Sequence, residues 1–162
     1  MAKALDQPSL YDTDYVAWLR EQVAHLRAGR LRALDVENLA EELESLMKKE
    51  RRQLENRLEV LIVHLLKWDH QPEQRSNRWR ASVAEQRARI RRLLRDSPSL
   101  KPSLEEAAHE VYPEAVEQVA IETRLSETSL PQALPYTVEQ IFERALRAEE
   151  LPDQRSPRKK RP

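Results

Sequence analysis

The densest group of side chains that could do chemistry is a run of arginines between residues 75 and 95. Eight arginines occur in this segment beside a single acid, Glu85. Arg87, Arg91 and Arg95 are four residues apart, so in a helix they line one face. Such a row could bind phosphates, each contact adding salt-dependent affinity, and Trp79 could stack on a base. One interpretation of the segment is therefore a nucleic-acid-binding surface.

Two acidic segments support the alternative, in which these arginines are neutralised within the fold or at a subunit contact. Residues 102–123 contain no Lys or Arg, and residues 35–44 are also acidic. Their acids are Glu105, Glu106, Glu110, Glu114, Glu117 and Glu122, and Asp35, Glu37, Glu41, Glu42 and Glu44. Trp79 lies on the apolar stripe of its predicted helix, which favours burial. We therefore favour internal or subunit pairing of the arginines over nucleic-acid binding.

A second candidate site lies where the long central helix meets the next one. Lys67, Trp68, Arg75 and Trp79 gather in this short stretch. The alternative is a packing corner, with both tryptophans buried and Ser76 capping the following helix. Together with the arginine row, these four residues are the predicted binding residues.

Metal binding and catalysis have weaker support. Helical bundles that bind two irons use Glu-x-x-His twice, and here the pattern occurs once, at Glu106 to His109. His64 sits among leucines, which is typical of a core histidine bonded to a backbone group. One glycine excludes Gly-rich phosphate loops, and the serines mostly lie at predicted helix caps. We expect no metal, no cofactor and no catalytic residue, with an undetected enzyme or metal-binding bundle as an alternative.

The composition predicts helices with wide solvated faces. Of 162 residues 35% are charged, there is one glycine, and 28 basic residues equal 28 acidic ones. The absence of cysteine excludes disulfides and thiolate metal sites. The longest apolar run, Val60 to Leu66, is too short to span a bilayer, and residues 1–10 lack a signal-peptide core. We expect a soluble cytoplasmic protein without a membrane partner or an identifiable small-molecule ligand.

Apolar residues at three- and four-residue steps predict about five helices. The predicted helices span residues 13–28, 35–71, 77–96, 103–126 with a break before Pro113, and 137–146. Met47, Leu54, Leu61 and Trp68 are seven apart, so we read residues 35–71 as one helix, roughly 50 Å long. A compact chain of this size is shorter than that, so the helix must bend, overhang or be shared with a partner.

Capping residues set the predicted helix ends. We assign the first cap to Asp12 or Thr13 and the first helix stop to Gly29. Ser76 caps the third helix, and capping boxes start at Ser103 and Thr137. The predicted fold is an all-α, single-domain bundle with one long central helix. Its predicted parts are a flexible N-terminus (1–10), a helical domain (11–148) and a disordered basic tail (149–162).

Several short stretches resemble a bacterial, largely cyanobacterial, family of uncharacterised proteins called domain of unknown function 29. The matching stretches are Tyr11–Asp14, Gly29–Asp35, Asn38–Glu44, Glu50–Arg52, His64–Trp68, Gln71–Pro72, Arg75–Trp79, Gln86–Arg87, Ser97–Leu100, Glu122–Thr123 and Pro135–Tyr136. The resemblance implies a compact helical fold and supplies no activity. The chain departs from the family at Met47, where a glycine is expected, and at Leu134, where a cysteine is expected. Met47 favours an unbroken second helix.

The first hypothesis for function is a non-catalytic helical interaction module that self-associates, as a homo-oligomer or with a partner protein. The overlong helix and the oppositely charged helices motivate it. The second hypothesis is a nucleic-acid-binding module that uses the arginine-rich third helix.

Overall fold

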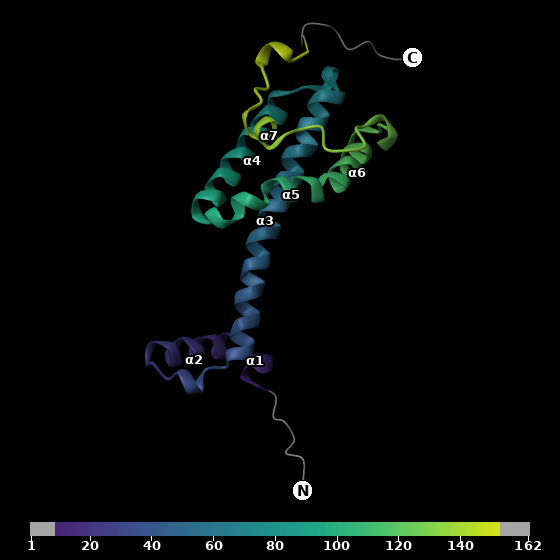
Figure 1. Cartoon of the computed structure of the whole chain (residues 1–162). Coiled ribbons are helices and arrows are strands. Elements are labelled where there is room, and N and C mark those ends of the chain that lie inside the picture. The colour runs from purple at the N-terminus through teal and green to yellow at the C-terminus, as the bar shows by residue number, and fades with distance from the viewer. Residues whose placement is uncertain (1–8, 153–162) are drawn as a thin grey trace. The chain divides into compact units, whose positions relative to one another are not determined.

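The computed structural model describes residues 9–152, and all regular structure within that range is helical (Figure 1). The α-helices there are α1 (Leu10–Thr13), α2 (Tyr15–Arg27), α3 (Val36–His70), α4 (Asn77–Asp96), α5 (Leu104–Glu110), α6 (Tyr112–Thr123) and α7 (Val138–Glu143). Short 3₁₀ turns at Leu31–Ala33, Pro72–Gln74, Pro98–Ser103, Glu127–Ser129 and Ala148–Glu150 connect or follow them. The predicted all-α fold with one long helix is confirmed, and no helix in residues 9–152 could cross a membrane.

The chain divides into two compact units, residues 1–49 and residues 50–162, and α3 contributes to both. We call them the N-terminal and C-terminal units. Most of the predicted flexible N-terminus and basic tail, residues 1–8 and 153–162, lies outside the described residues. The predicted boundaries at residues 11 and 148 therefore stay a prediction.

Helix α3 runs unbroken for 35 residues, as the seven-residue spacing predicted. Asp35 starts it, because its carboxylate accepts a hydrogen bond from the backbone N–H of Asn38 at 3.3 Å. The helix ends at His70, two residues before Pro72, because the residue that precedes a proline disfavours the helical conformation. Thirty-five residues at 1.5 Å each make it about 50 Å long.

The core of the C-terminal unit surrounds the second half of α3 (Figure 1). Leu61, Ile62 and Leu65 are fully buried, as their apolar run predicted. Helices α4, α5, α6 and α7 supply further core residues: Val83, Ile90, Leu93, Leu94, Ala107, Ala108, Tyr112, Ala115, Val119 and Ile141. The segments between these helices add Val111, Leu130 and Tyr136. The alanines of α5 and α6 have no side chain beyond Cβ, so they let the two helices pack close to the rest of the core.

Capping explains where the shorter helices begin. The Ser76 hydroxyl accepts from the Trp79 N–H at 3.4 Å, and Thr137 and Gln140 form the predicted capping box. The capping box predicted at Ser103 is wrong: its side chain makes no cap bond, because Ser103 is the last residue of a 3₁₀ turn and has helical dihedral angles. Asp14, not Asp12 or Thr13, caps α2, since its carboxylate accepts from the Ala17 N–H at 2.9 Å.

Two further helix ends follow from backbone conformation. The predicted break before Pro113 is confirmed, because α5 ends at Glu110 and α6 begins at Tyr112. Helix α6 stops at Thr123, short of the predicted Ser126, because Arg124 adopts the left-handed conformation with φ 60°. Gly29 takes the same conformation after α2, with φ 66°, as predicted for a helix-ending glycine.

The N-terminal unit is organised around Trp18, which is 2% exposed. Its indole N–H donates to Asp35 at 3.1 Å, and Gln22, also buried, accepts from the Asp35 backbone N–H at 2.9 Å. Tyr11 packs edge-on against the Trp18 ring at 4.8 Å between centroids. Polar contacts therefore dominate where α2 meets α3.

A tyrosine pair shares one carboxylate in the same unit. The hydroxyls of Tyr11 and Tyr15 donate to Glu42 at 2.7 and 2.6 Å. The hydrogen bond to Glu42 raises the pKa of Tyr11 to about 12, and the bonds from Tyr15 and Tyr11 lower the pKa of Glu42. These bonds fix α1 and the start of α2 to α3.

We expect the Leu61→Ala substitution to lower the free energy of unfolding by about 2–5 kcal/mol, because it opens a cavity beside fully buried neighbours. Urea unfolding followed by circular dichroism measures the change. Ile121→Ala is the matched control: this side chain is 73% exposed, so its truncation should cost less than about 0.5 kcal/mol. Equal losses in the two variants would contradict the position of the core.

Candidate functional site

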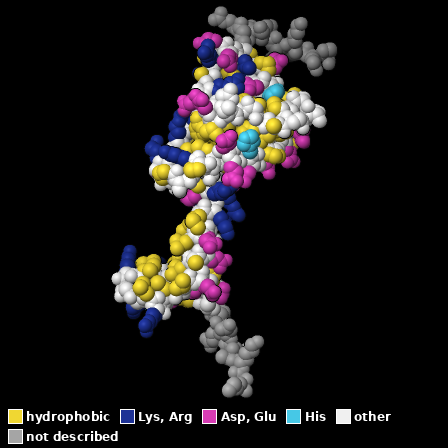
Figure 2. Space-filling view, in the orientation of Figure 1, with side chains coloured by type: hydrophobic (Ala, Val, Ile, Leu, Met, Phe, Trp, Pro, Cys, Tyr) yellow, Lys and Arg dark blue, Asp and Glu magenta, His cyan; other side chains and the backbone are white. Residues whose placement is uncertain are grey.

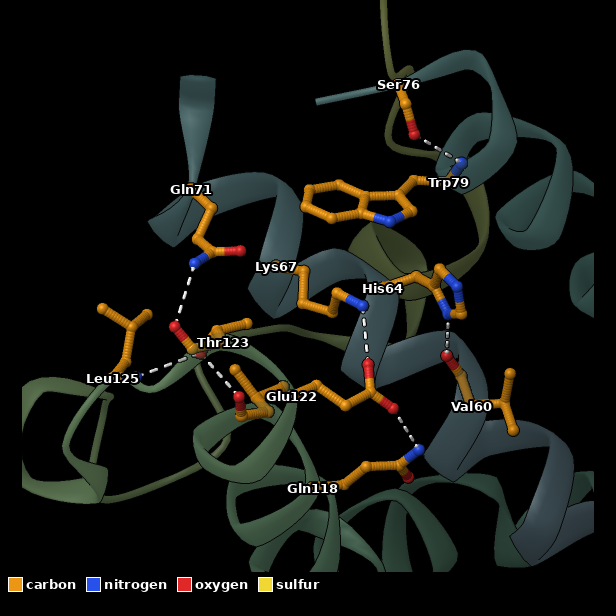
Figure 3. A network of polar contacts seen from close by, with 11 residues as sticks. Val60, His64, Lys67, Gln71, Ser76, Trp79, Gln118, Glu122, Thr123 and Leu125 are labelled. Carbon is orange, nitrogen blue, oxygen red and sulfur yellow. Dashed lines mark hydrogen bonds and ion pairs between the residues drawn. The ribbon is translucent and has the colours of Figure 1, made fainter. Parts of the chain in front are cut away.

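Lys67 and Trp79, two of the predicted binding residues, lie together at the edge of an open pocket of about 300 Å³ (Figure 3). The Lys67 ammonium is 2.6 Å from Glu122 and 4.9 Å from the centroid of the Trp79 ring. Trp79 is half-buried, so of the two tryptophans expected to be buried only Trp68 is fully so. Trp79 lies at the first turn of α4, where Lys67 covers its ring while the pocket stays open beside it.

The polar groups around this pocket are matched to one another (Figure 3). Glu122 accepts from Lys67 and, at 2.8 Å, from Gln118, and both bonds keep the pKa of Glu122 below its usual value. His64 contacts the Val60 carbonyl at 2.8 Å through Nδ1, so this nitrogen carries the proton. Burial lowers the pKa of His64, which keeps the ring neutral at pH 7. The cluster is a paired structural network rather than an unpaired acid and base.

Trp68 and Arg75 serve a different contact at the same corner. Trp68 is fully buried, and its indole N–H donates to Glu150 at 2.7 Å. Arg75 donates to the Trp68 carbonyl at 2.8 Å and lies over the Trp68 ring, 5.1 Å from its centroid. The two side chains hold the turn at residues 148–150 against the end of α3.

The arginines of α4 bind backbone carbonyls that follow or end α7. Arg80 donates to the Leu146 carbonyl at 2.9 Å, and Arg87 donates to the carbonyls of Ile141 and Arg144 at 2.8 Å each. Arg91 donates to the Phe142 carbonyl at 3.2 Å. The last carbonyls of a helix have no partner inside the helix and attract positive charge. We call this set of bonds to residues 141–146 the arginine clamp.

Arg75, Arg80, Arg87 and Arg91 are therefore bonded to other segments of the chain, but not to the predicted acidic partners. The acids of α5 and α6 pair with α3 instead: Arg51 binds Glu106 at 3.5 Å and Glu110 at 2.8 Å, and Lys67 binds Glu122. No sequence pattern indicated these pairs, because Arg51 and Lys67 lie more than fifty positions from their acidic partners on α5 and α6. Glu106 of the Glu-x-x-His pattern contacts Arg51. Residues 9–152 contain no cluster of three His, Asp or Glu side chains that could hold a metal ion.

The row Arg87, Arg91 and Arg95 does not present one uniform cationic face. Arg87 is half-buried, and desolvation lowers its pKa, whereas Arg95 is exposed and pairs with no carboxylate in the described part of the chain. The outer side of α4 borders a groove of about 390 Å³ that carries acids as well as arginines. Its charged lining residues are Glu50, Arg57, Arg89, Arg92 and Asp96. The groove lining therefore combines three arginines with two acids.

Asp69 is the centre of a half-buried network that the sequence did not predict. Its carboxylate binds the Arg144 guanidinium through both oxygens and accepts from the Tyr136 hydroxyl at 2.8 Å. Burial opposes ionisation of Asp69, but the bonds from Arg144 and Tyr136 outweigh it and lower the Asp69 pKa. The Pro135–Tyr136 motif was the one sequence feature that pointed to a member of this network, and it did not indicate Asp69 as the partner.

A surface of another kind lies on the N-terminal unit. Val16, Leu19, Val23 and Leu26 follow one side of α2, and Val36, Leu39, Leu43, Leu46 and Met47 follow one side of α3. We call these nine residues the apolar face. Val36, Leu43 and Met47 are 66, 61 and 65% exposed. Figure 2 shows apolar side chains gathered over α2 and the neighbouring part of α3.

The outward position of the apolar face corrects an expectation from the sequence. The apolar stripe expected on this helix, Tyr15, Trp18, Leu19, Val23 and Leu26, turns inward only in part: Trp18 is buried, whereas Tyr15, Val23 and Leu26 are exposed. A shallow groove of about 440 Å³ runs along α2 between Arg20 and Arg27. Contiguous exposed apolar surface of this kind marks interaction sites in soluble proteins.

The chain matches a known protein family. The model of the family described as "Domain of unknown function DUF29" matches residues 10–146, most of the chain, which confirms the resemblance seen in the sequence. No curated protein and no solved structure matches the chain.

We expect Arg87→Ala to lower the free energy of unfolding by about 1–3 kcal/mol, because two charge-assisted bonds to part-buried carbonyls are lost. Hydrogen exchange of the amides in residues 138–147 should accelerate more than exchange in α6. Arg92→Ala, whose side chain is 78% exposed, serves as the control with little change in either measurement. Unchanged exchange after loss of Arg87 would show that the clamp does not hold this segment.

We expect Asp69→Asn to lower the free energy of unfolding at pH 7 by about 1–3 kcal/mol. The Asp69 pKa is depressed in the folded protein, so its stabilisation is complete above the unfolded pKa, near pH 4, and is lost as the pH falls through the folded pKa. The two proteins should therefore converge in stability below about pH 4. Urea unfolding at several pH values tests this, with the exposed Asp96→Asn as control; a constant gap at all pH values would refute it.

Proposed function

This chain belongs to the DUF29 family, and we propose that it is a self-associating helical interaction module that binds a second copy of itself through the apolar face. The observation that carries the proposal is the exposure of this face. Leucine-type residues at three- and four-residue steps are buried in the C-terminal unit, whereas on α2 and the start of α3 they face outward.

Burial of the apolar face would supply the free energy of association. Full burial of one Val, Leu or Met side chain is worth about 1.5–3 kcal/mol, and seven of the nine residues of the face are exposed within one chain. Association also costs about 4–15 kcal/mol in lost freedom of motion, so partial burial of the nine residues can still leave a net gain. Both stripes have the spacing of positions a and d in interdigitating helices.

A second copy is the partner whose surface matches this face. A two-fold symmetric contact uses the same patch on both subunits. The apolar face offers two stripes of similar length, so each stripe of one copy has a stripe of the other to cover it. Nucleic-acid binding by α4 receives less support, because Arg80, Arg87 and Arg91 are already bonded to carbonyls in the arginine clamp.

We expect the full chain to run as a dimer in light scattering coupled to gel filtration, and the Leu43→Glu/Leu46→Glu variant to run as a monomer. Both leucines are exposed within one chain, so the charged residues should leave helix content unchanged in circular dichroism. Ile121→Glu, equally exposed but on α6, is the control that should keep the mass of the unmodified protein.

Two results count against self-association through this face. One is a monomer mass for the unmodified chain at about 100 μM, where a contact with a Kd of 1 μM would be nearly saturated. The other is a dimer mass that the Leu43→Glu/Leu46→Glu variant retains.

A further inference from the structure

The groove between α3 and α4 contains a half-buried arginine without a partner in the described part of the chain. The half-buried arginines of these two helices are Arg51, Arg57, Arg80 and Arg87. Arg51 is bonded to carboxylates, and Arg80 and Arg87 are bonded to backbone carbonyls. Arg57 forms no hydrogen bond or ion pair with residues 9–152, and its Nε is buried without a partner. Arg57 is therefore the exception among the four.

The helix around Arg57 supplies no counter-charge. Side chains three and four residues away are neighbours on a helix surface. The neighbours of Arg57 on α3 are not acidic: Gln53, Leu54, Val60 and Leu61. Partial burial of a charge without a partner costs free energy, which an anion bound from solution would recover. An unpartnered buried donor of this kind calls for a specific explanation, and a ligand is one.

Two arginines of α4 line the same groove from its other side. The groove has a volume of about 390 Å³ and lies between α3 and α4, which are neighbours in Figure 1. The Nε of Arg92 is 3.8 Å from Asp96, too far for a hydrogen bond, so the donors of Arg92 stay available. Arg89 binds Glu85 through Nε and Nη2 and retains its other terminal nitrogen. Guanidinium donors from two helices therefore converge on one groove.

The charges of the groove are separated along its length. Residues 71–76 form a short connection between α3 and α4, so the two helices run in opposite directions. Arg57 and Arg89 lie at similar distances from this connection, whereas Glu50 and Asp96 lie farther from it. The groove therefore has a basic end near the connection and an acidic end away from it.

We infer that this groove binds a small organic molecule with one oxyanion group, a carboxylate or a phosphate, at the end formed by Arg57, Arg89 and Arg92. The planar guanidinium can form two parallel hydrogen bonds with either group. The volume lies within the range of small-molecule sites, about 300–1,000 Å³. The acids at the other end repel a second negative charge, so the groove selects against polyanions such as nucleic acids.

Two probes that differ in their anionic group test the site. Benzoate and phenyl phosphate are titrated separately into the full chain at low salt, and isothermal titration calorimetry measures each Kd. Benzyl alcohol serves as the uncharged control. At least one of the two anions should bind with a Kd of about 1 mM or lower, and benzyl alcohol should not bind. The probe with the lower Kd identifies the preferred anionic group.

Substitutions of arginine locate the binding. Arg57→Ala should raise the Kd of the tighter probe about tenfold or more. Arg57→Lys should raise it less, because lysine keeps the charge and loses only the two-pronged geometry. Arg52→Ala is the matched control, since Arg52 is an exposed arginine of the same helix that does not line the groove. It should change the Kd less than about twofold. Circular dichroism verifies that each variant is folded.

A second measurement needs no substitution. Backbone amide chemical shifts in residues 53–57 and 89–97 should move during titration of the full chain with the tighter probe, because these segments line the groove. The amides of α6, which contributes no residue to the groove, should stay in place.

The outcomes separate this inference from the proposed self-association. Failure of both anions to bind would overturn the inference, as would a Kd that Arg57→Ala leaves unchanged. A loss of affinity that is equal in Arg52→Ala and Arg57→Ala would also overturn it, because it would show attraction by net charge without a defined site. The mass of the unmodified chain in solution bears only on self-association, so either proposal can fail while the other stands.

Discussion

The apolar second half of α3 is the constraint on which the C-terminal unit depends. Between Leu54 and Trp68 eight of its residues are buried, and they point in nearly all directions around the helix. Such a segment must be covered on every side, and α4, α5, α6 and α7 each cover part of it. Helix α7 has only six residues, too few to be stable alone. The arginine clamp and the Asp69 network supply the polar contacts that fix it in place.

The bonds that the charged residues form explain why the arginine run of residues 75–95 is not the best functional candidate. A guanidinium has five donors and a long apolar stem, so Arg80 and Arg87 can lie across the core edge and still reach carbonyls of another segment. Lys67, half-buried under Trp79, similarly bonds to Glu122. Arg20 and Arg27, by contrast, line the groove beside the α2 stripe, in the unit that buries the smaller number of side chains.

The spacing of apolar residues and the capping residues predicted most of the helices, but few of the contacts between them. The bounds of α4, the unbroken α3 and the capping box at Thr137 follow from spacing and capping over a few residues. The partners of Arg87 and Asp69 lie more than fifty positions away, and no local pattern encodes them. Periodicity likewise marked the stripe of α2 as apolar, but could not say what covers it. Of the predicted site, Lys67 and Trp79 do lie together, whereas Arg87 and Arg91 belong to the clamp.

The clamp has a consequence for how related sequences can vary. Its acceptors are main-chain oxygens, which every amino acid carries, so a change of side chain at residue 141, 142, 144 or 146 leaves the acceptor in place. The donors have no such freedom, because a lysine cannot reproduce the fork that Arg87 extends to two carbonyls at once. In related sequences we therefore expect the donor arginines to be conserved while the residues that supply the carbonyls vary. Pairwise covariation between positions would then not detect the contact.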